Sequence, residues 1–152
     1  MGNPGVNIQN EHAEWNIFID PVAANIVFNS GVPILLIPLD ATTYVPVTRD
    51  FYNALEKNHN TPAANLVYEL LTANLDFVDS GGFQFWDSLT SATFTDPNIV
   101  TFEEHNLRVV EEEGPESGRT KQDPSGAKIK VAVRADQKKF EQLFLTVLNW
   151  TD

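Results

Sequence analysis

A run of apolar residues from Val32 to Leu39, interrupted only by prolines, places the strictest limit on the fold of this chain. A strand that is apolar on both faces is typical of a sheet covered by helices on both sides. Asp40 follows directly, at the strand end where α/β proteins place groups that bind ligands. The sequence therefore predicts an α/β fold with a mostly parallel sheet flanked by helices.

Capping residues and apolar periodicity predict the helices. Asp20-Pro21 opens a first helix, because aspartate can cap it and proline is tolerated at the first helical position. Thr61-Pro62 opens a longer one, and Asp136 caps a final amphipathic helix. The stripe of the longer helix is wide enough to predict that it is well buried, and it includes Leu66, Leu70, Ala73 and Phe77.

The character of the chain changes after Ile99. Strands are predicted over Val100 to Glu112, Arg119 to Gln122 and Ala127 to Val133, with turns rich in glycine and proline between them. This pattern predicts a C-terminal β-meander before the final helix. With 152 residues, the chain has the length of one domain, which we expect to span residues 1–152.

Composition excludes several classes of protein. The formal charge of −11, with no cluster of Lys or Arg, argues against binding to nucleic acid or to anionic membranes. Cysteine is absent, which excludes disulfides, thiolate zinc sites and thiol nucleophiles. No apolar run is long enough to span a membrane, and the opening segment MGNPGVNIQN is not a signal peptide. We therefore expect a soluble protein, with the cytoplasm as the favoured compartment.

Four clusters compete as carriers of chemistry. Glu14-Trp15-Asn16 combines a carboxylate, an indole and an amide, which together suit a sugar with vicinal hydroxyls, although a polar loop entering a helix has the same composition. In Trp86-Asp87 the aspartate can be a helix cap and the tryptophan a core residue. The other two clusters are more simply read as solvated groups: Glu111-Glu112-Glu113, and the histidines His12, His59 and His105.

Taken together, several motifs resemble the nucleoside hydrolase family in order and spacing. They are Glu14 to Asp20, the strand ending in Leu39-Asp40-Ala41-Thr42, the segment Trp86 to Ala92, and Glu113 to Thr120. The resemblance covers nearly the whole chain from residue 5 onward. It implies the C-terminal half of a Rossmann-like nucleoside hydrolase fold. It also implies calcium-dependent hydrolysis of the N-glycosidic bond of ribonucleosides to ribose and free base.

The same resemblance implies roles for individual residues. Glu14 and Asn16 correspond to groups that hydrogen-bond ribose hydroxyls, and Asp87 to a carboxylate that ligates calcium. Asn7 is the candidate for the 5′-hydroxyl, with Asn3 and Asn10 as alternatives. Trp86 stands where other branches of the family carry a histidine. With Trp15, it resembles the purine-preferring (inosine-adenosine-guanosine) branch, in which aromatic rings stack on the base.

The sequence departs from the family pattern in one respect. The aspartate-rich loop that supplies most calcium ligands is absent, and Asp87 alone cannot satisfy an ion that takes about six to eight oxygens. We therefore expect an incomplete calcium site and a chain that is inactive by itself, as a truncated product, half of a split protein or a fragment. An N-terminal half or a second copy is then the expected partner, because the strand before Asp40 would present an open edge.

Two other functions remain open. One is a non-catalytic module derived from the family that binds nucleosides or a partner protein. The other is an unrelated α/β sugar-binding domain that shares the Glu14-Trp15-Asn16 segment by chance.

Overall fold

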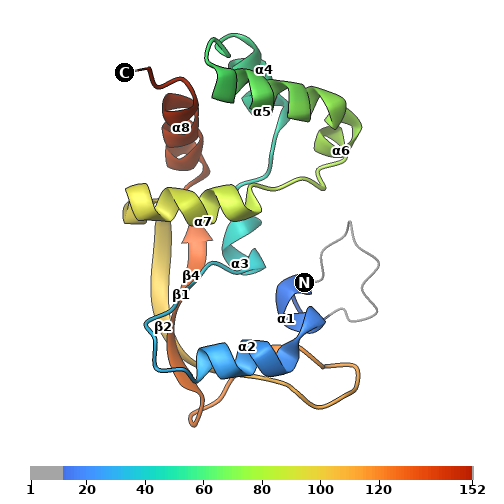
Figure 1. Ribbon diagram of the computed structural model, residues 1–152, viewed down its shortest axis with the longest axis vertical. Helices are drawn as coiled ribbons and strands as arrows, with labels where there is room; N and C mark the ends of the chain where they lie inside the picture. The colour runs from blue at the N-terminus through green and yellow to red at the C-terminus, as the bar shows by residue number, and fades with distance from the viewer. Residues whose placement is uncertain (1–11, 152) are drawn as a thin grey trace. The chain divides into compact units, whose positions relative to one another are not determined.

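The computed structural model describes residues 12–151, which fold into two compact units. Unit 1 comprises residues 12–39 and 102–133, and unit 2 comprises residues 40–101 and 134–151. Figure 1 shows the order of the elements along the chain. Two long strands, β2 (Val100–Val109) and β4 (Ala127–Ala135), contribute residues to both units.

Unit 1 contains a mixed sheet whose strands are hydrogen-bonded in the order β1-β4-β2-β3. The short strand β1 (Leu35–Leu36) runs parallel to β4, with Leu35 opposite Lys130. β3 (Thr120–Gln122) runs antiparallel to β2, with Leu107 opposite Gln122. The mixed sheet with helices agrees with the α/β class predicted from the sequence.

Two short helices precede the sheet in unit 1. α1 (Trp15–Ile19) is followed at once by α2 (Pro21–Phe28), and the Asp20 side chain caps α2 by accepting a hydrogen bond from Ala23 N–H at 2.8 Å. α2 packs on the strands through a small apolar core, which consists of Phe28, Leu107, Val109, Ile129 and Val131. The cap predicted at Asp20-Pro21 is confirmed.

The strand predicted over Val32 to Leu39 is wrong in length. Only Leu35–Leu36 is β structure, and Leu35 is 52% exposed, so the described residues do not cover this segment on both faces. The prolines at positions 33 and 38 explain the short pairing, because proline has no N–H to donate to a strand ladder. The residue after the segment, Asp40, lies in the short helix α3 (Leu39–Thr42).

The predicted meander is wrong in its pairing, although all three of its strands are present. In a meander β3 would pair with β4, whereas both strands pair with β2 here. The turn between them stays against β2, because Asp123 N–H donates to Asn106 O at 2.9 Å. Gly126 approaches the same strand so closely that a Cβ would lie 2.5 Å from Leu107 O. The chain therefore follows β2 through the turn instead of folding β4 onto β3.

Unit 2 is mostly helical, with the ends of β2 and β4 and an isolated antiparallel bridge between Pro46 and Gln84. In addition to α3, its helices are α4 (Arg49–Glu56), α5 (Pro62–Ala73), α6 (Leu75–Asp79), α7 (Trp86–Thr95), the 3-10 helix η1 (Pro97–Ile99) and α8 (Gln137–Leu148). α5 packs against α4 and α8, and α8 also packs against α7 and η1. An aromatic cluster fills the centre of the unit, with ring centroids 4.9 to 6.0 Å apart, and consists of Phe51, Phe85, Phe140 and Phe144.

Side-chain caps fix the start of two helices in unit 2. Thr61 Oγ1 accepts from Ala64 N–H at the start of α5 and donates to Leu148 O at the end of α8, which ties the two helices together. Asp136 Oδ1 accepts from Lys139 N–H at 3.1 Å and caps α8. Both caps agree with the prediction, because they depend on residues within one turn of the chain.

The predicted burial of α5 is wrong. Ala64 and Leu71 are buried, but Leu66 and Leu70 are 57% and 56% exposed. The two buried residues lie seven positions apart on one helical face, and the rest of the wide stripe is not covered within the described residues. None of the helices in the described part of the chain combines the length and apolarity needed to cross a membrane.

Candidate functional site

Glu14 begins α1, and a backbone group from another segment of unit 1 fixes its side chain. Glu14 Oε1 accepts from Leu39 N–H at 2.7 Å, while the Glu14 carbonyl accepts from Phe18 N–H at 2.8 Å. A hydrogen bond to an ionised acceptor is short and strong, so it holds the half-buried carboxylate in one orientation. A carboxylate has about four acceptor positions and can accept from more than one donor at a time.

Trp15 and Asn16 follow on the first turn of α1 and are exposed. Trp15 is 39% exposed, and α1 has no buried residue. Trp15 is therefore not a core residue within the described part of the chain, and its indole presents apolar surface to solvent. The segment Glu14-Trp15-Asn16 thus combines a fixed carboxylate with an accessible aromatic ring and an accessible amide.

A loop that joins β2 to β3 packs directly on α1. Gly118 in this loop has φ +78°, a conformation that favours glycine, and a Cβ there would lie 2.7 Å from Phe18 Cα and 3.2 Å from Ile17 O. The backbone of the loop therefore rests on the backbone of α1. In this way unit 1 brings together two of the motifs found in the sequence, Glu14 to Asp20 and Glu113 to Thr120.

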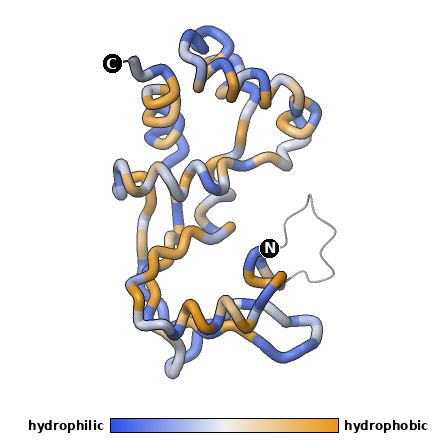
Figure 2. The backbone as a smooth tube through the Cα atoms, in the orientation of Figure 1, coloured by the Kyte–Doolittle hydropathy of each residue, from blue (hydrophilic) through white to orange (hydrophobic). Residues whose placement is uncertain are grey.

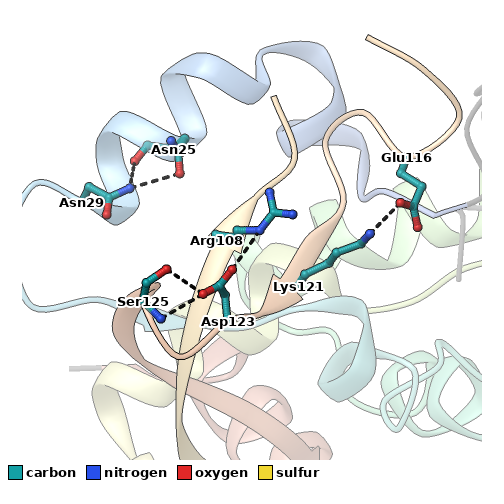
Figure 3. Close-up of polar contacts among 7 residues, drawn as sticks. All are labelled: Asn25, Asn29, Arg108, Glu116, Lys121, Asp123 and Ser125. Atoms are coloured by element: carbon teal, nitrogen blue, oxygen red, sulfur yellow. Dashed lines mark hydrogen bonds and ion pairs between the residues drawn. The ribbon is translucent and has the colours of Figure 1, made fainter. Parts of the chain in front are cut away.

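Ion pairs hold the same loop in shape. Glu116 binds both Arg119 and Lys121, and Figure 3 shows the pair with Lys121. The hydrogen bonds from Lys121 and then Arg119 lower the pKa of the Glu116 carboxyl. The two cations thus stabilise the charged form of Glu116 in the folded loop.

We expect this ion-paired loop to loosen in acid. Because the pKa of Glu116 is lowered on folding, its contribution to stability is complete above the ordinary glutamate pKa of about 4.3 and is lost as pH falls below it through the lowered pKa. In Glu116→Gln this contribution is absent at every pH. Hydrogen exchange of the Gly118 amide, which donates to Val110 O at 2.8 Å, measures the effect when it is followed from about pH 7 down to about pH 2, well below the ordinary glutamate pKa.

Glu113→Gln provides the control for this measurement. Glu113 is an exposed carboxylate of the same loop and has no ion pair within the described residues, so its removal should leave the pH dependence intact. A Glu116→Gln chain with the wild-type pH dependence would contradict the assigned role.

The far end of β3 carries a second polar cluster. Arg108 Nε lies 3.1 Å from Asp123 Oδ2, and Asp123 Oδ1 accepts from Ser125 N–H at 2.8 Å and from Ser125 Oγ at 2.6 Å (Figure 3). The bonds from Ser125, followed by Arg108, lower the pKa of the Asp123 carboxyl. Because each partner comes from the turn or from β2, this cluster has a structural role in holding the turn.

The acidic run at the end of β2 is solvated, as predicted. Glu111, Glu112 and Glu113 are all exposed, and Glu111 accepts from Asn25 Nδ2 at 2.9 Å. Figure 3 shows that Asn25 also accepts a hydrogen bond from Asn29, the residue at the C-cap of α2. A hollow of about 300 Å³ beside the run is lined by both signs of charge, including Glu112, Glu116, Arg108 and Lys121.

Trp86 and Asp87 lie at the start of α7 in unit 2. The half-buried Trp86 ring packs at 5.7 Å and 38° on Phe83, which in turn stacks on Phe77 at 5.4 Å. Trp86 therefore belongs to a row of three rings and still exposes part of its surface. The role of Phe83 was missed in the sequence, where the only signal was a cluster of aromatic residues after two glycines.

Asp87 does not cap α7. The residue at the cap position is Phe85, no side chain caps this helix, and the exposed Asp87 carboxylate has no hydrogen bond or ion pair within residues 12–151. This contradicts the interpretation of Asp87 as a helix cap and leaves its oxygens available to a ligand. The first turn of a helix favours a carboxylate there.

The described residues by themselves do not fit a calcium ion. They contain no group of three or more His, Asp or Glu side chains that could hold a metal, whereas Ca²⁺ takes about six to eight oxygen ligands. Asp87 offers at most one carboxylate. A calcium site in this region would need ligands from other residues.

The structure thus places the predicted site residues in two groups. Glu14, Trp15 and Asn16 form one stretch in unit 1, and Trp86 and Asp87 form another in unit 2. Asn7, with its alternatives Asn3 and Asn10, lies outside the described residues. Sequence reasoning missed Gly118, whose contact with α1 joins segments that are a hundred residues apart.

Comparison with known proteins relates the chain to one family. Residues 2–142 match the family described as inosine-uridine preferring nucleoside hydrolase. A pyrimidine-specific ribonucleoside hydrolase from Escherichia coli is 32% identical over 135 residues, which is 82% of this chain and 43% of the relative. Nucleoside hydrolase 3 from Arabidopsis thaliana is 41% identical over 87 residues, or 54% of this chain and 10% of the relative.

Solved structures share the fold. An inosine-uridine preferring nucleoside hydrolase from Bacillus anthracis superposes with a TM-score of 0.81 at 26% identity, covering 97% of this chain and 47% of that protein. A purine-preferring ribonucleoside hydrolase from Gardnerella vaginalis superposes with a TM-score of 0.70 at 31% identity, covering 90% of this chain and 46% of that protein. The chain therefore spans about half the length of these structures.

Proposed function

This chain belongs to the inosine-uridine preferring nucleoside hydrolase family, and we propose that it binds ribonucleosides and takes part in hydrolysis of their N-glycosidic bond to ribose and free base. One observation carries the proposal. The Glu14 carboxylate is fixed by Leu39 N–H, while Trp15 and Asn16 beside it are exposed. A fixed acceptor next to an open amide and an open aromatic face has the chemistry needed to hold a ribose.

In this proposal the sugar is held by Glu14 and Asn16. The carboxylate accepts from a ribose hydroxyl, and the amide both donates and accepts, which suits a hydroxyl that does the same. Asn7 is proposed as the partner of the 5′-hydroxyl. Because Glu14 and Asn16 would hold the ribose hydroxyls in fixed positions, they would orient the sugar before the base departs.

We further propose that the base stacks on aromatic side chains and that purines are preferred. Trp15 is accessible, and Trp86 retains exposed surface while its other side packs on Phe83. Stacking of a base on an aromatic ring is worth roughly 1–3 kcal/mol, and the larger purine ring gains more from it. Relatives at similar identity include both purine-preferring and pyrimidine-specific enzymes, so the support comes from these two residues.

Asp87 is proposed as one calcium ligand in a site that other residues must complete. Its carboxylate is exposed and unpaired within the described residues, which suits a hard oxygen ligand. The remaining ligands are proposed to come from a complementary segment that supplies an aspartate cluster.

Exposed apolar surface in unit 1 supports the proposal that a complementary segment packs against this unit. Figure 2 shows the apolar residues of α2, of which Val22, Ile26 and Val27 are 53%, 66% and 55% exposed. The β1 strand is at the end of the strand order and exposes Leu35. Solvation of these groups is unfavourable, so a covering strand and helix would be stabilised by their burial.

The activity test is release of free base from inosine and from uridine in the presence of calcium. We expect the 152-residue chain to bind inosine, which quenches tryptophan fluorescence, but to release no base, because Asp87 alone cannot hold the metal. Removal of calcium by a chelator should leave its thermal stability unchanged. Turnover by this chain alone would disprove the expected inactivity.

Trp86→Ala tests the base contact, with Trp150→Ala as its matched control. Trp150 is 70% exposed near the end of the chain and belongs to neither proposed group. Loss of one stacking contact predicts about tenfold weaker binding of inosine in Trp86→Ala only. Equal affinity of the two variants would contradict the stacking role of Trp86.

A non-catalytic nucleoside-binding module is the second candidate function. It is favoured because the described residues contain no group of three or more side chains that could hold a metal ion. The two functions separate when a family segment that carries the aspartate cluster is added. Restored release of base supports the hydrolase, and binding without release supports the module.

A further inference from the structure

A hollow of about 560 Å³ lies in unit 2, where β4 ends and α8 begins. Its lining includes Tyr44, Thr101 and Arg134, together with Lys138 and Lys139 from the first turn of α8. The volume lies within the range of about 300–1,000 Å³ that is common for small-molecule sites. This lining does not include the described residues proposed above for the nucleoside or the metal, which are Glu14, Trp15, Asn16, Trp86 and Asp87.

The hollow concentrates positive charge in an acidic chain. Three of the ten Lys and Arg residues line it, in a chain whose net charge is −11. Five of the other seven form ion pairs in the part of the chain that the structure describes, as Arg49 does with Asp79 and Lys128 with Glu104. Arg134 and Lys138 have no ion pair within residues 12–151. The hollow therefore holds cations that the described residues do not neutralise.

Asp136, the one carboxylate among the described residues of the lining, is already engaged. Asp136 Oδ1 caps α8 by accepting from Lys139 N–H at 3.1 Å, and its Oδ2 lies 3.9 Å from Lys139 Nζ. Lys138 and Lys139 also occupy the helix end where positive side chains are electrostatically unfavourable. These two lysines lower the stability of α8 when no ligand is bound. An anion bound beside them would offset this cost, which explains why they are placed there.

An aromatic ring orients the third cation. The Arg134 guanidinium lies over the Tyr44 ring, 5.4 Å from its centroid, and Tyr44 is 45% exposed. A guanidinium is planar and carries a fork of N–H donors in that plane, which matches the oxygens of a phosphate. The Thr101 hydroxyl adds a neutral donor and is exposed within the described residues.

We propose that this hollow binds the phosphate group of a small molecule. The phosphate is held by Arg134, Lys138 and Lys139, and the Tyr44 ring provides apolar surface for an attached organic group. A phosphate carries more than one negative charge near neutral pH, so it neutralises these cations better than a single carboxylate does. The source is either inorganic phosphate or a phosphate ester, which share this chemistry.

Titration of the ¹⁵N-labelled chain with phenyl phosphate and with inorganic phosphate, at constant ionic strength, tests the proposal. We expect saturable shifts of the Thr101 and Lys138 amide signals with a Kd in the millimolar range or below (about 1 mM). Tighter binding of phenyl phosphate assigns the site to an ester whose organic part lies on Tyr44. Equal binding assigns it to inorganic phosphate.

A pair of double variants makes the test specific. Lys138→Ala/Lys139→Ala should weaken binding at least tenfold without loss of the fold, because both lysines are exposed and unfavourably placed for the helix. Lys128→Ala/Lys130→Ala removes the same charge from exposed positions of β4 outside the lining and should leave the Kd unchanged. The proposal is overturned if the wild type shows no saturable shifts at Thr101 and Lys138, or if both double variants weaken binding equally.

Discussion

Gly118→Ala is expected to destabilise unit 1 by about 2–4 kcal/mol and to abolish nucleoside binding. Two effects add at this position. The φ of +78° is strained for any residue with a Cβ, and the new Cβ would lie 2.7 Å from the Cα of Phe18. That neighbour is backbone and cannot rotate away, so α1 must shift, and Trp15 and Asn16 shift with it. Denaturant unfolding measures the loss of stability.

Gly31→Ala separates the two effects. Gly31 lies in the same unit at φ +77°, but a Cβ there would meet nothing within 4 Å. This control carries the backbone strain alone and should cost about 1 kcal/mol, with nucleoside affinity unchanged. Hydrogen exchange of the Phe18 amide, which donates to Glu14 O, reports directly on α1. If the two variants are equally stable, the loop does not support α1.

Glu14→Gln and Glu14→Ala should separate the structural role of Glu14 from its proposed role in binding. In Glu14→Gln the side-chain oxygen can still accept from Leu39 N–H, so stability should fall by less than about 1 kcal/mol. The charge that would strengthen a hydrogen bond to a ribose hydroxyl is lost. Affinity for inosine should therefore fall by about tenfold or more, since a hydrogen bond to a charged group contributes about 1.5–3 kcal/mol.

Glu14→Ala removes both the hydrogen bond to Leu39 N–H and the proposed hydrogen bond to the ribose. The part-buried Leu39 N–H loses its partner, which costs about 1–3 kcal/mol, and its exchange with solvent should accelerate. Glu111→Gln is the charge-matched control in the same unit, because Glu111 is exposed and contacts Asn25 on α2. Wild-type affinity in Glu14→Gln would show that this carboxylate does not bind the sugar.

Local features of the chain were predictable from the sequence for a physical reason. The caps at Asp20, Thr61 and Asp136 depend on hydrogen bonds to backbone groups within three residues, so the same short segment contains both the signal and the structure. The α/β class and the family also followed from the sequence, because the motifs occur in order along the chain. The comparisons confirm the family.

Features that depend on distant segments were not predictable. The burial of α5 is set by which elements cover it, and a periodic pattern does not contain that information. The pairing of both β3 and β4 with β2 depends on a turn that stays against Leu107. The cap role predicted for Asp87 is wrong for a local reason: α7 begins with Phe85 at its cap position, so Asp87 lies within the first turn of the helix.

The Glu14-Trp15-Asn16 segment illustrates the difference between what the sequence determines and what the tertiary structure determines. The sequence alone shows a carboxylate beside an indole and an amide, and this combination indicates a segment that could bind a sugar. Only the tertiary structure decided that Leu39 N–H fixes the carboxylate and that the loop at Gly118 supports the helix beneath Trp15 and Asn16. Both contacts join residues far apart in the chain, and it is these contacts that convert a polar stretch into an ordered candidate site.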